Sequence, residues 1–283
     1  MKKVIVAGID FSDCSINALD HAIDIANRAQ ADVLMVWVNR PETGKEIYSV
    51  DPGQIIAEAN KRFEALKQSR QPMLNGGKIN YQIRKGKVYK EIVQAADEVD
   101  AFLIVVGTHG ASGFEEFWIG SNANRIVSAS ERPIITIRGG IDMLKPISRI
   151  VMPIDSTVES RQKVPFTSLL AKYYDAEIHV LTLFSSPMPE IRDVVREYVN
   201  QVTLYLTENQ LKHVVTELEA DNLTDVTIEY AIKVDANLIS IMDEQETTTA
   251  NIWLGPYAQQ MINHSPIPVL CIHAKDLIAG AEK

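Results

Sequence analysis

The sequence predicts an α/β protein built from two tandem open parallel-sheet domains of the Rossmann-like type, with helices on both faces of each sheet. Two observations carry this prediction. Apolar strand segments alternate with amphipathic helical segments, and the chain repeats itself. Residues 4–10 are echoed by 149–155 at an offset of 145, and residues 132–137 by 267–272 at an offset of 135. We therefore place the domains at residues 1–140 and 146–283, separated by a linker that contains glycine and proline.

The first copy supplies each expected element in order. Nearly continuous apolar runs predict strands buried on both faces, and apolar residues three or four apart predict helices between them. The strands are expected at residues 4–9, 33–38, 79–83, 102–106 and 134–137. The helices are expected around Ile16–Ala26, Ile55–Leu66, Val88–Val99 and residues 121–130. Ligands of such sheets bind beyond the carboxyl ends of the strands, here at Asp10, Val38 and Gly107.

The second copy is about ten residues shorter, as the two offsets show. Residues 231–238 leave too little chain for a counterpart of the third helix, so we expect that helix to be missing. Pro165 falls within the expected first helix of this copy, and proline is tolerated only in the first turn of a helix. That helix is therefore expected to start late or to kink.

Composition narrows the classes of function. The chain has 28 Lys and Arg against 37 Asp and Glu, a formal net charge of −9. Such an acidic chain is a poor partner for nucleic acid or for an anionic membrane surface. No apolar run approaches the length of a membrane span. The two cysteines, Cys14 and Cys271, have no metal-ligand spacing and are expected to be free thiols in the cytoplasm.

A glycine-rich loop follows the fourth expected strand and carries the clearest chemistry. Gly107 and Gly110 are separated by two residues, Gly110 and Gly120 by nine, and Ser121 opens the next helix. Glycines allow the backbone to approach a ligand closely, and a helix N-terminus attracts an anion. This pattern favours a phosphate. Read individually, the same residues would be ordinary turn glycines and an N-cap serine.

The spacing Gly-x2-Gly-x9-Gly-Ser, together with Asp10 after the first strand, resembles the universal stress protein family over nearly the whole chain. The resemblance is stronger in residues 1–140 than beyond residue 146, and it implies a stress-response or regulatory protein that binds ATP, either alone or with Mg²⁺. It also implies roles for individual residues. The triphosphate would be held by the glycine-loop positions, the ribose would be contacted by Asp10, and the adenine edge would be read by the backbone of Val38. The loop positions are Gly107, His109, Gly110, Gly120, Ser121 and Asn122.

Three residues of the first copy depart from the family pattern. Phe11, Cys14 and Trp37 are bulkier or less polar than a nucleotide pocket requires, and they would narrow the site if they faced it.

The second copy retains Asp155 but not the glycine loop. Its equivalent stretch reads Asp243-Glu244-Gln245-Glu246, and Pro256 replaces Ser121. Carboxylates repel phosphate, and proline removes both a hydroxyl and an N–H. We expect a solvated loop here, the alternative being a divalent-cation site.

The second domain would then be a structural partner of the first. The family resemblance implies pairing of the last strands, residues 134–137 and 269–272, in an intramolecular pseudo-dimer or a homodimer.

Two rival functions remain open. One is an enzyme that uses the nucleotide, but no Walker A or dinucleotide fingerprint is present, so at most slow ATP hydrolysis is expected. The other is an interaction module that binds a protein partner and no nucleotide. The nucleotide content of the purified protein would separate the interaction module from an ATP-binding regulator.

Overall fold

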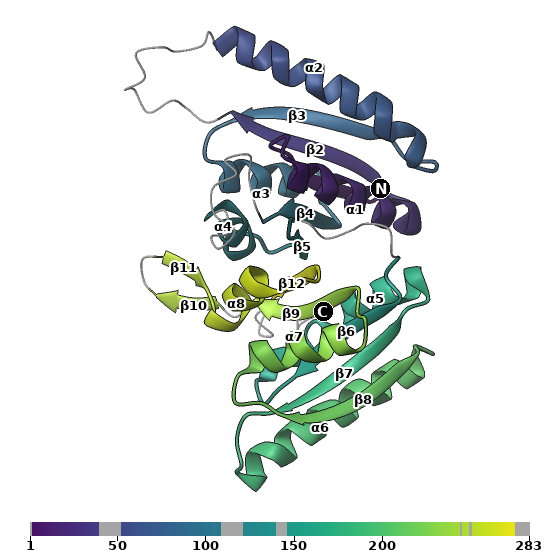
Figure 1. Cartoon of the computed structure of the whole chain (residues 1–283), viewed down its shortest axis with the longest axis vertical. Helices are drawn as coiled ribbons and strands as arrows, with labels where there is room; N and C mark the ends of the chain where they lie inside the picture. Colours follow the sequence, from purple (N-terminus) through teal and green to yellow (C-terminus); the bar gives the residue numbers. More distant parts are fainter. Residues whose placement is uncertain are drawn as a thin grey trace, which may run out of the picture. The chain divides into compact units, whose positions relative to one another are not determined.

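A computed structural model of the chain describes residues 2–39, 52–108, 121–139, 146–243, 245–248 and 251–274 (Figure 1). The chain divides into two compact units, Met1–Met143 and Leu144–Lys283. Each unit contains a parallel sheet with helices on both faces, which confirms the predicted fold class.

In the first unit, the strands pair in parallel in the order β3-β2-β1-β4-β5. The strands are β1 (Val4–Gly8), β2 (Asp32–Asn39), β3 (Ile79–Lys85), β4 (Leu103–Gly107) and β5 (Ile134–Ile137). The helices are α1 (Asp13–Ala29), α2 (Pro52–Arg70), α3 (Val88–Glu98), α4 (Ser121–Ala129) and the short 3-10 helix η1 (Gln71–Met73). Strands β2 and β3 lie on one side of β1, and β4 and β5 lie on its other side. Folds of this kind form a ligand crevice at this point, between β1 and β4.

Side-chain contacts show which helices cover which face of this sheet. On one face, Phe63 of α2 stacks on Tyr81 of β3 with ring centroids 4.6 Å apart, and Arg70 of α2 pairs with Asp20 of α1 at 2.9 Å. On the other, Arg84 of β3 pairs with α3, and α3 packs on α4. Helices α1 and α2 therefore share one face, and α3 and α4 share the opposite one (Figure 1).

The core lies along the central strands. Ile5, Val6 and Ala7 of β1 are all 0% exposed, as expected of an apolar strand covered on both faces. Leu103, Ile104 and Val105 of β4 are equally buried, which is why these strands carry no polar alternation. Among the described residues, no helix is both long enough and apolar enough to cross a bilayer.

In the second unit, the strands pair in the equivalent order β12-β9-β6-β7-β8. They are β6 (Arg149–Ile154), β7 (Glu177–Phe184), β8 (His213–Glu219), β9 (Leu238–Asp243) and β12 (Val269–His273). An antiparallel hairpin of β10 (Gln245–Thr248) and β11 (Asn251–Leu254) follows β9. The helices are η2 (Val158–Arg161), α5 (Val164–Tyr174), α6 (Pro189–Glu208), α7 (Leu223–Lys233) and α8 (Pro256–His264).

The expectation that the second copy lacks the third helix is wrong. Helix α7 (Leu223–Lys233) stands between β8 and β9, as α3 stands between β3 and β4, and Asn222 caps its first turn. Most of the shortening lies earlier in the chain. Residues 40–51 separate β2 from α2, whereas only residues 185–188 separate β7 from α6. The deletion is therefore in a connection and spares the helix.

The expectation for Pro165 is confirmed. Helix α5 begins at Val164, with Pro165 in its first turn and the short helix η2 (Val158–Arg161) before it. Its counterpart α1 already begins at Asp13, a position equivalent to the start of η2. Proline at the start of a helix loses no intrahelical hydrogen bond, so the chain places it where the regular helix can begin.

Burial of His21 in α1 makes the stability of the first unit depend on pH. Its Nε2 atom is buried and lacks a hydrogen-bond partner. Removal from water lowers its pKa from 6.5 to about 4, although Asp24 and Asp20 act in the opposite direction. The unfolded state therefore binds the proton more readily between these values, so stability is complete above pH 6.5 and is lost as the pH falls toward 4.

We expect His21→Gln to reduce the pH dependence of folding. Between pH 7.5 and pH 5.0, the free energy of unfolding should fall by about 2 kcal/mol less in the variant than in the parent. Urea denaturation at both pH values measures the difference, and the comparison at pH 7.5, where both side chains are uncharged, corrects for lost packing. An unchanged pH dependence would show that the pKa of His21 is the same in the folded and unfolded states.

Candidate functional site

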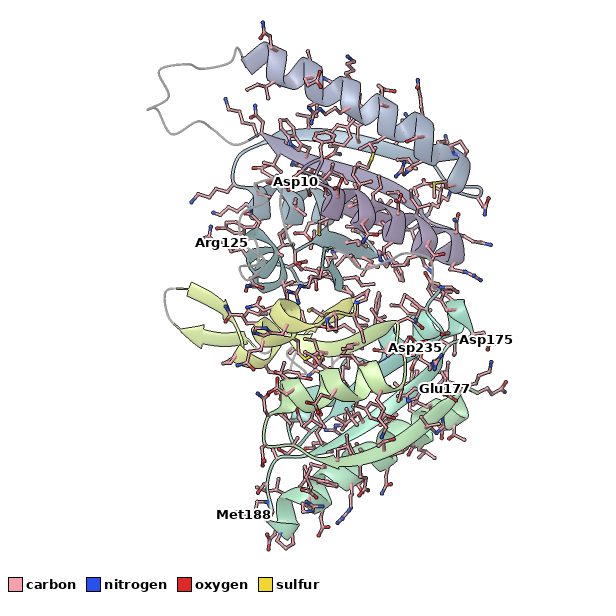
Figure 2. All side chains as sticks on the ribbon, viewed as in Figure 1. Asp10, Arg125, Asp175, Glu177, Met188 and Asp235 are labelled. Atoms are coloured by element: carbon pink, nitrogen blue, oxygen red, sulfur yellow. The ribbon has the colours of Figure 1, made fainter. Side chains whose placement is uncertain are left out.

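The carboxyl ends of β1, β2 and β4 bring together three of the predicted site residues. Asp10 follows β1 (Val4–Gly8), Val38 is the second-to-last residue of β2, and Gly107 is the last residue of β4. Parallel strands end at one edge of the sheet, so these positions lie beside the point where the strand order reverses, which is where folds of this kind form a ligand crevice. Figure 2 shows Asp10 at this edge of the first unit.

Asp10 is held at the N-terminus of α1. Its Oδ1 atom accepts hydrogen bonds from the backbone N–H of Ser12, at 3.0 Å, and from the Ser12 hydroxyl. The backbone N–H of Asp10 donates to Ser15 Oγ at 3.2 Å, and Ser12 caps the helix by accepting from the N–H of Ser15. The loop thus fixes an exposed carboxylate beside the positive end of a helix.

Gly107 is required by the close approach of α1. A Cβ atom at this position would lie 2.8 Å from Cys14 Sγ and 3.1 Å from the Cys14 carbonyl carbon. Beneath it, Cys14 Sγ donates to the carbonyl of Ile137 at 3.3 Å, and the N–H of Thr108 donates to the same oxygen at 2.9 Å. Cys14 is therefore buried in packing that joins α1, β4 and β5.

Val38 extends β2 beyond the end of its neighbour. The β1–β2 register ends with Gly8 opposite Val36, and the Val36 carbonyl accepts from the N–H of Ile9 at 2.8 Å. Backbone groups two residues apart in a strand point to the same side. The peptide groups of Val38 therefore face the loop that carries Asp10, and the role of Val38 in binding adenine stays a prediction.

The remaining predicted residues belong to the glycine loop and the helix after it. His109, Gly110 and Gly120 lie outside the described residues. Ser121 is the first residue of α4, and Asn122 is half-buried in its first turn. The helix start predicted at Ser121 is confirmed, whereas the contacts of the loop with a ligand stay a prediction.

Sequence reasoning missed Arg125, an exposed cation on α4. Figure 2 shows Arg125 on α4 of the first unit. Arg125 follows Ser121 by four residues, and residues four apart lie on the same side of a helix. The spacing Ser-x3-Arg after the last glycine is the signal that would have identified it.

Phe11 and Trp37 do not narrow the crevice. Trp37 precedes Val38, so its side chain points to the opposite face of the sheet. The Phe11 ring packs on Phe63 of α2 with centroids 5.0 Å apart. Both rings therefore lie on the α2 face, away from the face that carries α4.

The second unit retains half of this arrangement. Asp155 Oδ1 accepts from the backbone N–H and the hydroxyl of Thr157 at 2.7 and 2.6 Å, as Asp10 does from Ser12. Helix α8 begins with Pro256 after Gly255, as the alignment predicts, and so lacks the N–H at its first position. The second unit therefore retains the carboxylate arrangement of Asp10 but not the serine at the start of the following helix.

Asp243, the first residue of the acidic stretch in the second unit, is not part of a solvated loop as was expected, and Glu244 lies outside the described residues. Asp243, at the end of β9, is 1% exposed and its Oδ2 lies 3.1 Å from Nδ1 of His273. Burial raises the pKa of Asp243 despite that contact. Gln245 and Glu246 belong to the β10–β11 hairpin. The described residues contain no group of three or more His, Cys, Asp or Glu placed to hold a metal ion.

Comparisons with known proteins agree with this architecture. The model of the universal stress protein family matches residues 1–138 and again residues 146–273, so the chain belongs to that family, with two copies of its domain. Among the relatives, Universal stress protein MJ0531 of Methanocaldococcus jannaschii is 32% identical over 139 residues, 48% of this chain and 82% of that protein. YxiE of Bacillus subtilis is 30% identical over 148 residues, 48% of this chain and 98% of that protein.

Among solved structures, a universal stress protein from Archaeoglobus fulgidus matches 96% of this chain and 98% of its own, with a TM-score of 0.76 and 15% identity. That likeness shows the two-domain fold. Another solved relative is a universal stress protein in complex with cAMP, which matches 47% of this chain and 95% of its own with 24% identity and a TM-score of 0.36. The predicted pairing of residues 134–137 with 269–272 stays a prediction.

The fit around Gly107 predicts that Gly107→Ala destabilises the first unit. The new methyl group would force α1 away from β4, at a cost of roughly 1–3 kcal/mol. Thermal and urea unfolding measure the loss. Gly139→Ala is the matched control, because a Cβ at Gly139 meets nothing within 4 Å. Equal stability of the two variants would contradict the assigned contact.

Proposed function

We propose that this protein is a cytoplasmic regulator that binds one ATP in the crevice of the first unit and turns it over slowly or not at all. The observation that carries the proposal is the convergence of Asp10, the backbone of Val38 and the start of α4 at the point where the strand order reverses. The polar groups of this crevice follow the end of β1, lie near the end of β2 and begin α4, and all of these lie at one edge of the sheet.

The nucleoside end of the ligand matches Asp10 and Val38. A carboxylate accepts hydrogen bonds from ribose hydroxyls, and Asp10 is held in place by Ser12 and Ser15. The peptide groups of Val38, which extend past the end of β1, can pair with the edge of an adenine ring. In this proposal, one side chain selects the sugar and one stretch of backbone selects the base.

The phosphate end matches the loop that joins β4 to α4. In this proposal, Gly107, Gly110 and Gly120 let the backbone approach the phosphates, while His109 and Asn122 add polar side chains at the loop and the first helical turn. Ser121 offers its N–H and hydroxyl at the helix start, where the dipole favours negative charge. Arg125 adds a positive charge one turn further on. Bound Mg²⁺ would offset the remaining charge of the triphosphate.

The described residues of the second unit differ from those of the first at positions that we propose bind phosphate. Pro256 removes an N–H donor at the start of α8, and a buried carboxylate, Asp243, stands at the end of β9. We therefore infer a stoichiometry of one nucleotide per chain, with the second unit serving as a structural partner.

Paired substitutions of Asp10 and Asp155 test this asymmetry. Asp10→Ala removes a charged hydrogen-bond acceptor and is expected to weaken ATP binding about tenfold or more. Asp155→Ala is the matched control, since Asp155 has the same geometry in the second unit. Isothermal titration calorimetry measures both. Equal losses in the two variants would mean that both units bind.

A second test transfers one residue of the second unit to the first. Ser121→Pro imports the residue found at the start of α8, and proline is tolerated at the first position of a helix. We expect the variant to fold and to lose most of its ATP affinity, because a hydroxyl and an N–H both disappear. Bound nucleotide is measured by chromatography after denaturation of the freshly purified protein.

The same assay on the parent protein gives the amount of nucleotide bound per chain. About one intact ATP per chain supports the proposal, and ADP in its place would indicate turnover. Absence of nucleotide, with none taken up from added Mg-ATP, would favour the interaction module that binds no nucleotide.

A further inference from the structure

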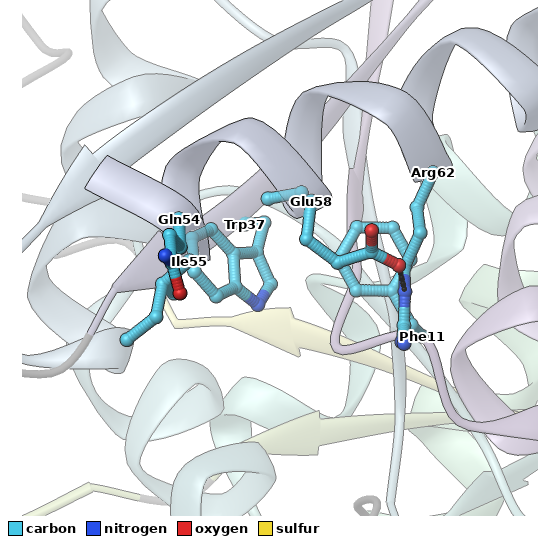
Figure 3. Close-up of a pocket in the computed structure, with 7 residues that line it drawn as sticks. Phe11, Trp37, Gln54, Ile55, Glu58 and Arg62 are labelled. Atoms are coloured by element: carbon cyan, nitrogen blue, oxygen red, sulfur yellow. Dashed lines mark hydrogen bonds and ion pairs between the residues drawn. The ribbon is translucent and has the colours of Figure 1, made fainter. Parts of the chain in front are cut away.

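We propose that the first unit has a second binding site, on the α2 face, for a neutral planar aromatic heterocycle that presents hydrogen-bond acceptors at its edge. The site is the pocket in Figure 3, about 480 Å³ in volume, which we call the aromatic pocket. This volume falls within the range of roughly 300–1,000 Å³ typical of small-molecule sites. It is lined by Phe11, Trp37, Gln54, Ile55, Glu58, Ala59 and Arg62.

The aromatic pocket is separate from the nucleotide crevice. Trp37 and Val38 are consecutive in β2 and point to opposite faces of the sheet. Met35, two residues before Trp37, pairs in register with Tyr81, whose ring stacks on α2. Trp37 therefore faces α2, whereas α4 belongs to the other face.

The floor of the aromatic pocket is preformed. Phe63 is 0% exposed. Its ring packs against the rings of Phe11 and Tyr81, with centroid distances of 5.0 Å and 4.6 Å. Phe11 in turn lies 6.2 Å from Trp37. The Tyr81 hydroxyl donates to Glu64 of α2 at 2.9 Å, which ties the helix to β3. A ligand would meet rings that the core already fixes.

The conformation of Phe11 supports a role beyond packing. Its φ of 63° lies in the left-handed region, which is rare for a bulky side chain. Such strain persists only where the surroundings enforce it, and it is concentrated at binding sites. Here it turns the ring into the aromatic pocket, and leaves Phe11 and Trp37 half-buried in a concave surface.

The rim defines the chemical class of the ligand. Arg62 Nε donates to Glu58 Oε1 at 3.0 Å, so their charges balance and neither a strong anion nor a cation is favoured. The carboxylate is engaged by that contact, while the Gln54 amide and the Arg62 guanidinium supply N–H donors at the exposed edge. Two aromatic rings below and donors at the rim match a flat ring that carries carbonyl oxygens or ring nitrogens.

Caffeine is a suitable probe, because it is a neutral purine with acceptors only and with no sugar or phosphate. In a full-length variant with Trp118→Phe and Trp253→Phe, Trp37 is the one tryptophan left of three. We expect saturable quenching of its fluorescence by caffeine. Ile55→Arg, which places a charged chain in the aromatic pocket, should weaken this binding at least tenfold. Ile56→Arg is the matched control, because Ile56 is 41% exposed and does not line the pocket.

Two outcomes would overturn the proposal. One is the absence of saturable quenching in a variant whose circular dichroism matches the parent. The other is binding that saturating ATP abolishes or that Ile55→Arg and Ile56→Arg affect equally, because caffeine would then occupy the nucleotide crevice or the general surface. Quenching that persists in Asp10→Ala, even where ATP no longer binds, keeps this inference distinct from the proposed nucleotide function.

Discussion

The close contact between the first turn of α1 and the end of β4 is the constraint on which the first unit's crevice depends. At Gly107 there is no room for a Cβ atom, because Cys14 lies against the strand and hydrogen-bonds to Ile137. In the second unit, Met242 occupies the place of Gly107, because Met242 pairs with Ile272 as Gly107 pairs with Ile137. The alignment expected from the sequence, which put Asp243 at that place, is therefore shifted by one residue. Regular helix starts only at Val164, and the short η2 precedes it against β9. The loss of one glycine and the late start of one helix are thus two parts of the same change in packing.

The second unit has a buried carboxylate at the edge that corresponds to the proposed phosphate site of the first unit. Asp243 is buried where the first unit has Thr108, and its partner His273 stands at the end of β12. Burying a carboxylate is costly unless it is paired, and the Oδ1 atom of Asp243 has no hydrogen-bond partner. A second anion at this edge would add to that cost. The change from Ser121 to Pro256 points in the same direction, since it removes a donor from the equivalent helix start.

Much of the architecture follows from the sequence, because strands buried on both faces must be continuously apolar and ligands of parallel sheets gather at the carboxyl edge. We wrongly expected the second copy to lack its third helix, because we assigned its missing residues to the wrong part of the chain. An internal repeat gives the size of a deletion but not its position, which here is mainly the connection at residues 185–188. The aromatic pocket had no local signal, since Phe11 reaches Trp37 and Phe63 only through an unusual backbone angle. Arg125, by contrast, could have been identified in the sequence, because it follows Ser121 by four residues.

Asp10 and Phe11 are consecutive, yet different interactions hold them. Asp10 is fixed by hydrogen bonds to Ser12 and Ser15 at the start of α1, whereas Phe11 is fixed by a buried ring on α2. Phe11, where these two sets of contacts meet, has a left-handed φ. Removing the Asp10 carboxylate leaves the rings in place, and a charge on the wall formed by Ile55 leaves the Ser12 hydrogen bonds in place. Substitutions can therefore change the contacts of Asp10 and those of the aromatic pocket separately. Each of the two proposed binding sites can then be tested without altering the other.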